Sequence, residues 1–302
     1  MGFNVTICKA IIYAYILFEL GKKMSEEKAP MESKFETTIE EAIKNRLSTV
    51  KHKIIILSGK GGVGKSTVTA NLAAFLAKRE FSVGVFDYDF HGPAIPRMLG
   101  ARQDSLKAFP LGIFPATGVL GIKIVSIAYL LPDERTPVIW RGPLKFKALK
   151  ELLSQVIWGN LDFLLFDLPP GTGDEALNIA HTIPNVDGAI VVTIPSELSS
   201  IVVEKSVEFC KHLNIKLLGV IENMSYLICP KCGSKIELFG KGGADRIVND
   251  ERVPLIGRIP LDPNLSIMMD QGKPLALNNP DSEAAKAFKN ITDRILELLG
   301  EK

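Results

Sequence analysis

The sequence predicts an α/β protein with an open, mainly parallel sheet that has helices on both faces. The first observation is that short apolar runs alternate with helical patterns from residue 53 onward, as in successive βαβ units. The second is a glycine-rich loop between the first apolar run and the first helix of this series. The third is that two later apolar runs end in aspartate, at the strand ends where such sheets bind ligands.

Six apolar runs are the expected strands, because strands that are covered on both faces are apolar without alternation. They lie at residues 54–57, 83–86, 122–127, 163–166, 189–193 and 217–221. Helices are expected at residues 65–78, 144–156, 174–180, 199–213 and 281–299. A further short helix is predicted at residues 38–47, where Thr38 and Glu41 have the spacing of a capping box with Thr38 as the N-cap.

The composition favours one globular domain. Of the 302 residues, 46% are hydrophobic and 23% are charged, which excludes a mostly disordered or collagen-like chain. The formal net charge of +2 provides no global attraction for nucleic acid, and none is expected as a partner. We expect residues 51–302 to form this domain and residues 1–50 to form an N-terminal extension.

Residues 1–23 differ in character from the rest of the chain. The apolar run at residues 10–18 is shorter than the ~20 residues that a spanning helix needs, so no membrane partner is expected. Two interpretations stay open for residues 1–23. Either translation starts at Met24 and these residues are not native, or they form an amphipathic attachment helix.

The glycine-rich loop matches the phosphate-binding motif G-x-x-x-x-G-K-[ST]. Glycines let backbone N–H groups turn toward phosphate oxygens, and the following helix N-terminus favours negative charge. Lys65 is expected to reach the β- and γ-phosphates of ATP, and the Ser66 hydroxyl to bind Mg²⁺. The alternative is a strand–helix turn that binds no ligand. The expected nucleotide-binding residues are Gly59, Lys60, Gly61, Gly62, Val63, Gly64, Lys65, Ser66 and Thr67.

Carboxylates follow two of the predicted strands. Asp167 has the position of a Walker B aspartate, which holds Mg²⁺ directly or through water. Asp87 and Asp89 are two residues apart and share one face of an extended chain. One of them is expected to support the metal while the other orients the attacking water. The alternative for each aspartate is a helix cap or a turn former.

Cys229 and Cys232 form a CxxC pair that is followed by Gly233. Two thiolates at this spacing can share one metal centre, and the sequence has no second CxxC pair. A site with four thiolates therefore needs two chains. The spacing alone fits zinc as well as an iron–sulfur cluster. A close cysteine pair in a chain with four cysteines indicates a reducing compartment, which we expect to be the cytoplasm.

Other candidate residues are not expected to belong to a site. The glycine-rich stretch at residues 240–244 lacks the G-K-[ST] ending and is predicted to be a loop. Cys210 lies in a helical pattern and is predicted to be a buried structural thiol. The histidines show no ligand spacing and are expected to be solvated or to form local hydrogen bonds; they are His52, His91, His181 and His212.

The motifs together resemble one family. The loop KGGVGKST (residues 60–67) resembles the deviant Walker A loop of the MinD, ParA and nitrogenase iron protein ATPases. Four further segments are similar to the Mrp/ApbC-type ATP-binding iron–sulfur cluster carriers, which match residues 50–302. They are DYDFHGPAIPRMLG (87–100), WRGP (140–143), DLPPGTGDEAL (167–177) and IENMSYLICPKCG (221–233).

The resemblance implies a homodimeric ATPase with slow turnover that transfers a [4Fe–4S] cluster to apo-proteins. It implies that Lys60 contacts the nucleotide of the partner subunit and that Asp89 positions the attacking water. It also implies that Asn223 contacts adenine and that Cys229 and Cys232 of two protomers hold one bridging cluster. The alternatives are a MinD/ParA-like partitioning ATPase and a zinc-bound, nucleotide-dependent scaffold.

Overall fold

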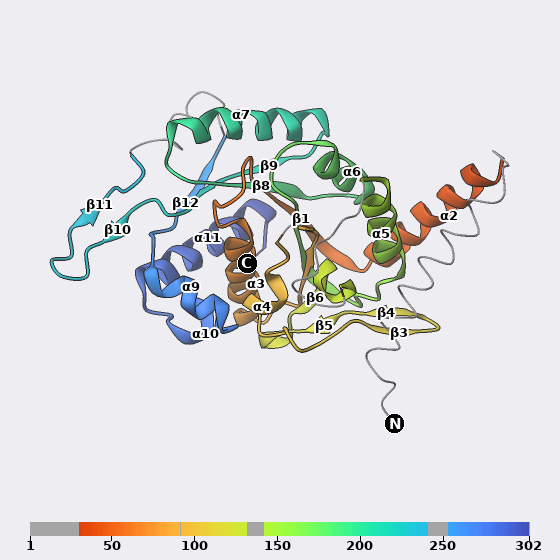
Figure 1. Cartoon of the computed structure of the whole chain (residues 1–302), viewed down its shortest axis with the longest axis horizontal. Helices are drawn as coiled ribbons and strands as arrows, with labels where there is room; N and C mark the ends of the chain where they lie inside the picture. The colour runs from red at the N-terminus through yellow and green to blue at the C-terminus, as the bar shows by residue number, and fades with distance from the viewer. Residues whose placement is uncertain (1–29, 91, 132–141, 241–252, 302) are drawn as a thin grey trace.

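The computed structural model describes residues 30–90, 92–131, 142–240 and 253–301. They form an eight-stranded sheet with the order β12-β9-β8-β1-β7-β2-β6-β5, in which only β5 is antiparallel to its neighbour (Figure 1). This confirms the predicted fold class. The strands are β1 (Val50–Leu57), β2 (Val83–Asp87), β5 (Ala116–Thr117), β6 (Lys123–Ser126), β7 (Leu161–Asp167), β8 (Gly188–Thr193), β9 (Leu217–Glu222) and β12 (Leu255–Arg258).

All six predicted strands are present. Five of them extend one to four residues beyond their apolar runs, and β6 is two residues shorter than its predicted run. In the central strand β1, Ile54, Ile55 and Ile56 are all completely buried, although their side chains alternate between the two faces of the sheet. Both faces are therefore covered, which explains why the strand is apolar without alternation. The edge strands β5 and β12 were not predicted. β5 has only two residues, and β12 (LIGR) contains a glycine and an arginine in place of a continuous apolar run.

Helices cover both faces of the sheet (Figure 1). α3 (Lys65–Lys78), which has the predicted bounds, packs with α11 (Glu283–Leu299) on one face. α5 (Gly142–Gln155), α6 (Asp174–Thr182) and α7 (Glu197–His212) lie on the other face, and α2 (Pro30–Leu47) packs on α5. The shorter helices are α4 (Ile95–Met98), α9 (Pro263–Asp270) and α10 (Leu275–Asn278), together with 3₁₀ turns at Val119–Gly121 and Ile127–Leu130.

The predicted start of the first helix was wrong. α2 spans Pro30–Leu47, so Thr38 lies inside the helix and cannot be its N-cap. The capping-box spacing occurs within a longer stretch of helix-forming residues, and a proline is favourable in the first turn of a helix. By contrast, Ser282 caps α11 because its hydroxyl accepts a hydrogen bond from the amide of Ala285 at 3.1 Å.

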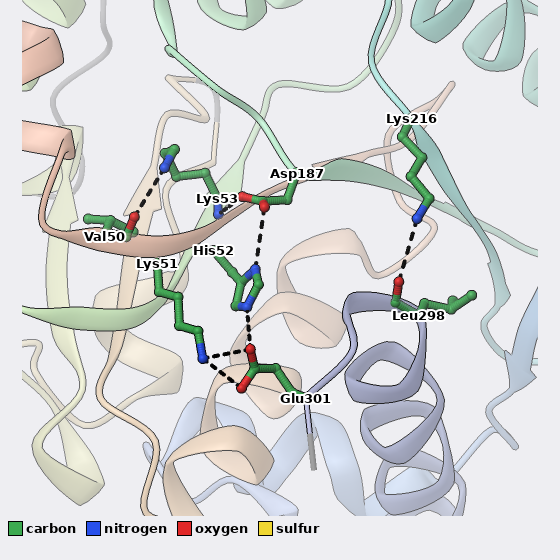
Figure 2. Close-up of polar contacts among 8 residues, drawn as sticks. All are labelled: Val50, Lys51, His52, Lys53, Asp187, Lys216, Leu298 and Glu301. Carbon is green, nitrogen blue, oxygen red and sulfur yellow. Dashed lines mark hydrogen bonds and ion pairs between the residues drawn. The ribbon is translucent and has the colours of Figure 1, made fainter.

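His52 departs from the expectation of a solvated or locally bonded histidine. It is 8% exposed, and its ring nitrogens lie 2.8 Å from Glu301 and 3.4 Å from Asp187 (Figure 2). Lys51 also binds Glu301, and the pKa of this carboxyl is lowered first by the hydrogen bond from Lys51 and then by that from His52. These contacts fasten the end of the chain, just beyond α11, to the central strand β1.

Two hairpins extend from the sheet, and one of them carries the cysteine pair. β3 (Lys107–Phe109) pairs with β4 (Gly112–Phe114), and β10 (Leu227–Ile228) pairs with β11 (Lys235–Ile236). The β10–β11 hairpin projects away from the helices and the main sheet (Figure 1).

Several predictions fall outside the residues that the structure describes. These are the predictions for residues 1–23, for His91, for the segment 140–141 and for most of the glycine-rich stretch at 240–244. In the described part of the chain, no helix combines the length and the apolar content that crossing a bilayer requires.

Candidate functional site

The candidate site lies where three neighbouring parallel strands end. β7 pairs with β1 on one side and with β2 on the other, so the loop after β1 and the aspartates of β2 and β7 meet at one edge. Asp87 and Asp167 are direct partners in the register of β2 and β7, and the amide of Tyr88 donates to the carbonyl of Asp167 at 3.0 Å. The sheet therefore brings together the predicted phosphate loop and two of the predicted carboxylates.

The phosphate loop requires glycine at position 64. Gly64 has φ +81° and is the N-cap of α3, and a Cβ at this position would lie 2.3 Å from Nδ2 of Asn223. Both the left-handed backbone and the close approach exclude a side chain here. Gly61 and Gly62 are exposed at the top of the loop, whereas Val63 is 2% exposed and anchors it in the core.

α3, the helix that follows the loop, begins with three of the predicted nucleotide-binding residues, Lys65, Ser66 and Thr67. Lys65 and Ser66 occupy the first turn of α3 and reach the carboxylates, as described below. The half-buried Thr67 accepts a hydrogen bond from Nδ2 of Asn71 with its carbonyl, at 2.9 Å. Gly59 and Lys60, at the start of the loop, are partly exposed.

Asn223 supports the loop from below. It follows β9 directly, is 4% exposed and donates from Nδ2 to the carbonyl of Val63 at 2.9 Å. The structure thus gives this residue a role that the sequence did not indicate. A contact with adenine stays a prediction, and it would have to use the groups of the amide that Val63 leaves available.

Asp167 is the best connected carboxylate of the site. It is completely buried, and its Oδ2 lies 2.8 Å from Nζ of Lys65 and accepts a hydrogen bond from Ser66 at 2.6 Å. Its Oδ1 accepts from the hydroxyl of Thr69 at 2.8 Å. Sequence reasoning missed Thr69, although it lies one helical turn after Lys65 and so shares a face of α3 with it.

Asp87 is buried beside this pair and carries a strongly shifted pKa. Burial, and then the neighbouring carboxylate of Asp167, raise the pKa of Asp87 to about 7, against the lowering effect of Lys65. The hydroxyl of Ser126 donates to Asp87 at 3.0 Å. Ionisation of both buried carboxylates would leave negative charge that the single ammonium group of Lys65 does not compensate.

The donor set of this edge fits Mg²⁺. Asp87, Asp167 and the hydroxyl of Ser66 supply only oxygen ligands, which hard divalent cations prefer. The cation would also compensate the charge that Lys65 alone leaves uncompensated. The chemistry of these residues supports the predicted metal role.

Asp89 and Lys60 lie at the rim of the site. Asp89 is partly exposed, and its backbone amide lies 3.3 Å from Oδ1 of Asp87. It is therefore the predicted carboxylate that solvent reaches most easily. Nζ of Lys60 lies 3.4 Å from the hydroxyl of Ser196, the N-cap of α7, so within one chain this lysine rests on α7.

The cysteine pair forms a tight turn between β10 and β11. The amide of Gly233 donates to the carbonyl of Cys229, and the amide of Cys229 donates to the carbonyl of Ser234, both at 2.9 Å. Gly233 has φ +71°, which closes the turn. Cys232 is exposed and Cys229 is partly exposed, so both thiols can meet a metal or a partner.

The thiol of Cys232 ionises easily. Its Sγ lies 3.0 Å from Oγ of Ser234, and this hydrogen bond is the first cause that lowers the pKa of Cys232, to about 7. The thiolate is the form that binds metals. Across the described ranges, no group of three or more His, Cys, Asp or Glu side chains is placed to hold a metal ion, so the pair alone does not complete a site.

Cys210 is the buried structural thiol that the sequence predicts. It is 1% exposed in α7, and burial raises its pKa to about 12. It therefore stays protonated at neutral pH and is unsuited to metal binding.

The chain is similar to known proteins over most of its length. Residues 49–296 match a family model described as a NUBPL iron-transfer P-loop NTPase. An iron–sulfur cluster carrier protein from Saccharolobus solfataricus is 47% identical over 85% of this chain and 87% of its own length. One from Methanocaldococcus jannaschii is 52% identical over 84% of this chain and 87% of its own length.

Solved structures agree with the fold. A nucleotide-binding protein from Archaeoglobus fulgidus, described in complex with ADP and with Co, is 40% identical with a TM-score of 0.70, over 78% of this chain and 91% of that one. The MinD cell division protein of Aquifex aeolicus is 22% identical with a TM-score of 0.59, over 83% of this chain and 98% of that one, and shows the fold alone. By the match over residues 49–296 and the identity to its relatives, the chain belongs to the family of NUBPL-type iron-transfer P-loop NTPases.

Proposed function

We propose that this protein is an ATP-dependent carrier that assembles a [4Fe–4S] cluster and transfers it to apo-proteins. The carrier is a homodimer in the cytoplasm, and its slow hydrolysis of ATP to ADP and phosphate changes the geometry of the dimer around the cluster. Residues 51–302 act as the ATPase domain and residues 1–50 as an extension of it.

The observation that carries this proposal is that one chain combines two sites. The β10–β11 turn presents the thiols of Cys229 and Cys232, and the edge of the main sheet brings a phosphate loop next to the buried Asp87 and Asp167. The names of relatives at 47% and 52% identity support the same function. The ADP of the Archaeoglobus fulgidus protein, which is 40% identical, supports nucleotide binding.

The residues of the sheet edge have distinct roles in hydrolysis. Lys65 neutralises charge on the β- and γ-phosphates, and the loop amides of residues 59–67 hold the phosphate oxygens. Ser66, Asp87 and Asp167 would hold Mg²⁺, which would supply charge stabilisation at the phosphates. Asp89, which solvent reaches, orients the attacking water.

The cluster would bridge two protomers because each chain has a single CxxC pair, Cys229 and Cys232. A [4Fe–4S] cluster is held by four cysteine thiolates, so two chains complete the set. A cluster held at an exposed subunit junction is accessible to a recipient, which suits transfer. Zinc is the alternative occupant, since the spacing of the two thiols fits it equally.

One experiment separates these possibilities. The protein is purified anaerobically, reconstituted with iron and sulfide, analysed for iron, sulfide and zinc, and then mixed with an apo iron–sulfur protein. The proposal expects an absorption band of a [4Fe–4S] cluster and activation of the acceptor. One tightly held zinc per dimer without iron uptake would leave the zinc scaffold. Nucleotide-dependent sedimentation with vesicles or DNA, without transfer, would favour a partitioning ATPase.

The role of Asp89 predicts a loss of turnover without a loss of binding. In the Asp89→Asn variant the amide cannot accept a proton from water, and kcat is expected to fall by ~10²-fold or more, the scale of a lost general acid–base group. ATP affinity is expected to change little because Asp89 lies at the rim of the site. Phosphate release and titration with a fluorescent ATP analogue measure the two quantities. Equal kcat in the variant and the wild type would remove Asp89 from this role.

The proposed action of Lys60 across the dimer predicts complementation. Lys60→Ala and Lys65→Ala chains are each expected to be inactive as homodimers. In a mixed dimer, the site on the Lys60→Ala chain keeps its own Lys65 and receives the intact Lys60 of the partner. About half of the mixed dimer's sites can then turn over, and phosphate release is expected to reappear on mixing. A mixture as inactive as each parent would show that Lys60 does not act on the partner's nucleotide.

A further inference from the structure

Lys145 of α5 is a charged residue on an otherwise apolar helix face. It is 6% exposed, and the other buried residues of this helix are Ala148, Leu149, Leu152 and Leu153, at the spacing of one helical face. A buried ion pair is often no more stabilising than apolar side chains of similar volume. Stability alone therefore does not account for a lysine at this position.

We propose that Lys145 is a positioning residue for ATP hydrolysis that holds Asp89 and couples it to the loop after Asp167. This inference rests on the proposed ATPase function. Lys145 acts through its contacts with the residues on either side of Asp89 and with the first turn of α6.

The first contact runs through the backbone of α5. The carbonyl of Lys145 accepts a hydrogen bond from the hydroxyl of Tyr88 at 2.5 Å, and Tyr88 is 2% exposed. Tyr88 directly precedes Asp89 in the chain. The hydrogen bond therefore ties the end of β2 to α5 immediately before the carboxylate that is proposed to orient water.

The second contact uses the ammonium group. Nζ of Lys145 lies 5.1 Å from the centroid of the Phe90 ring, within the range of a cation–π interaction. Phe90 is 2% exposed and packs edge-on against Tyr88, with ring centroids 4.7 Å apart. Lys145 thus contacts both chain neighbours of Asp89, one through its carbonyl and the other through its charge.

The third contact reaches the other side of the site. Nζ of Lys145 lies 2.7 Å from Oε1 of Glu175, whose side chain is 35% exposed. Glu175 is in the first turn of α6, directly after the loop of residues 168–173 that follows Asp167. The amide of Gly171 in this loop donates to the carbonyl of Ser58, next to the phosphate loop, at 2.7 Å.

One ammonium group therefore connects two segments that leave the site from β2 and from β7. A shift of the loop at residues 168–173 moves the first turn of α6, and the ion pair passes this movement to the segment that carries Asp89. Correct placement of Asp89 then depends on the position of the loop. Because small displacements of a catalytic group have large effects on rate, a small movement of this loop would change the rate of ATP hydrolysis.

The test uses variants with a matched control on the same helix. Lys145→Met keeps the length and apolar volume of the side chain but removes the charge, and Lys145→Arg keeps the charge. The control is Lys150→Met. Nζ of Lys150 lies 4.9 Å from the ring centroid of Phe146 and 3.9 Å from Glu40, so it combines the same two kinds of contact away from the site.

Lys145→Met is expected to lower kcat by about 10- to 10²-fold, the cost of a misplaced catalytic group, with KM for ATP changed by less than about 2-fold. Lys145→Arg is expected to recover a large part of kcat, and Lys150→Met to match the wild type. Glu175→Gln is expected to lower kcat as well, and the double variant with Lys145→Met to lose little more than the worse single variant, since both remove one interaction.

Amide hydrogen exchange gives a second measurement that does not need turnover. Exchange at residues 88–90 is expected to be faster in Lys145→Met than in the wild type and unchanged in Lys150→Met. If the wild type does not hydrolyse ATP, the proposed function fails while the exchange data still decide whether Lys145 holds this segment. An unchanged kcat in Lys145→Met, while Asp89→Asn is inactive, would overturn the inference and leave the ATPase proposal intact. Unchanged exchange at residues 88–90 would also overturn it.

Discussion

The Lys65→Ala variant is expected to lose ATP binding and also to unfold more readily than the wild type without nucleotide. Lys65 is the cation that lies 2.8 Å from Asp167, and Asp87 is buried next to this pair. Breaking a buried pair by removal of one partner typically costs about 3–5 kcal/mol, because the other charge is left uncompensated. Titration with a fluorescent ATP analogue and thermal unfolding in nucleotide-free buffer measure the two effects separately.

A second substitution distinguishes loss of binding from loss of structure. In the double variant Lys65→Ala/Asp167→Asn the uncompensated carboxylate is gone, so part of the lost stability is expected to return. ATP binding is not expected to return, because the group that contacts the phosphates is still missing. Wild-type ATP affinity in Lys65→Ala would contradict the assignment of this residue. A double variant no more stable than Lys65→Ala would contradict the electrostatic explanation.

Replacement of either Cys229 or Cys232 by serine is expected to abolish the cluster. Each substitution removes two ligands from a site that two protomers share, which leaves two thiolates for a cluster that needs four. Reconstituted wild type is expected to contain about four iron atoms per dimer, rather than per monomer. Iron and sulfide analysis together with the absorption spectrum measures the loss.

The control for this experiment is Cys210→Ser. Cys210 is buried in α7, away from the β10–β11 hairpin, so this variant is expected to keep the cluster. All three variants are expected to bind ATP, since the phosphate loop follows a different strand. A wild-type cluster content in Cys229→Ser or Cys232→Ser would exclude the bridging arrangement.

Local patterns were sufficient for the elements that build the site. The bounds of α3 follow from a glycine-rich turn before a stretch rich in alanine and leucine, and each central strand follows from a continuous apolar run. The rule that ligands collect at the carboxyl ends of parallel strands then brings Asp87 and Asp167 together, as the register of β2 and β7 confirms.

Contacts between distant polar residues could not be predicted in the same way. Thr69 binds Asp167, Tyr88 binds the carbonyl of Lys145, and His52 binds Glu301, each across a large separation in sequence. No periodicity marks such pairs, because each depends on how elements pack after they have formed. The capping box at Thr38 was wrong for a different reason. The local spacing fits a helix start, but the helix begins at Pro30 and continues through Thr38.

The position of β7 between β1 and β2 has a consequence for the synthesis of the chain. β1 and β2 emerge from the ribosome first, yet neither pairs with the other, and both partners of β1 are made later. Until Asp167 has left the ribosomal tunnel, β7 is not available to pair with β1 and β2. Asp87 and Asp167 therefore cannot yet come together in the nucleotide site. Nucleotide therefore cannot assist folding of the first half of the chain, and this interval is when chaperone protection against aggregation matters most.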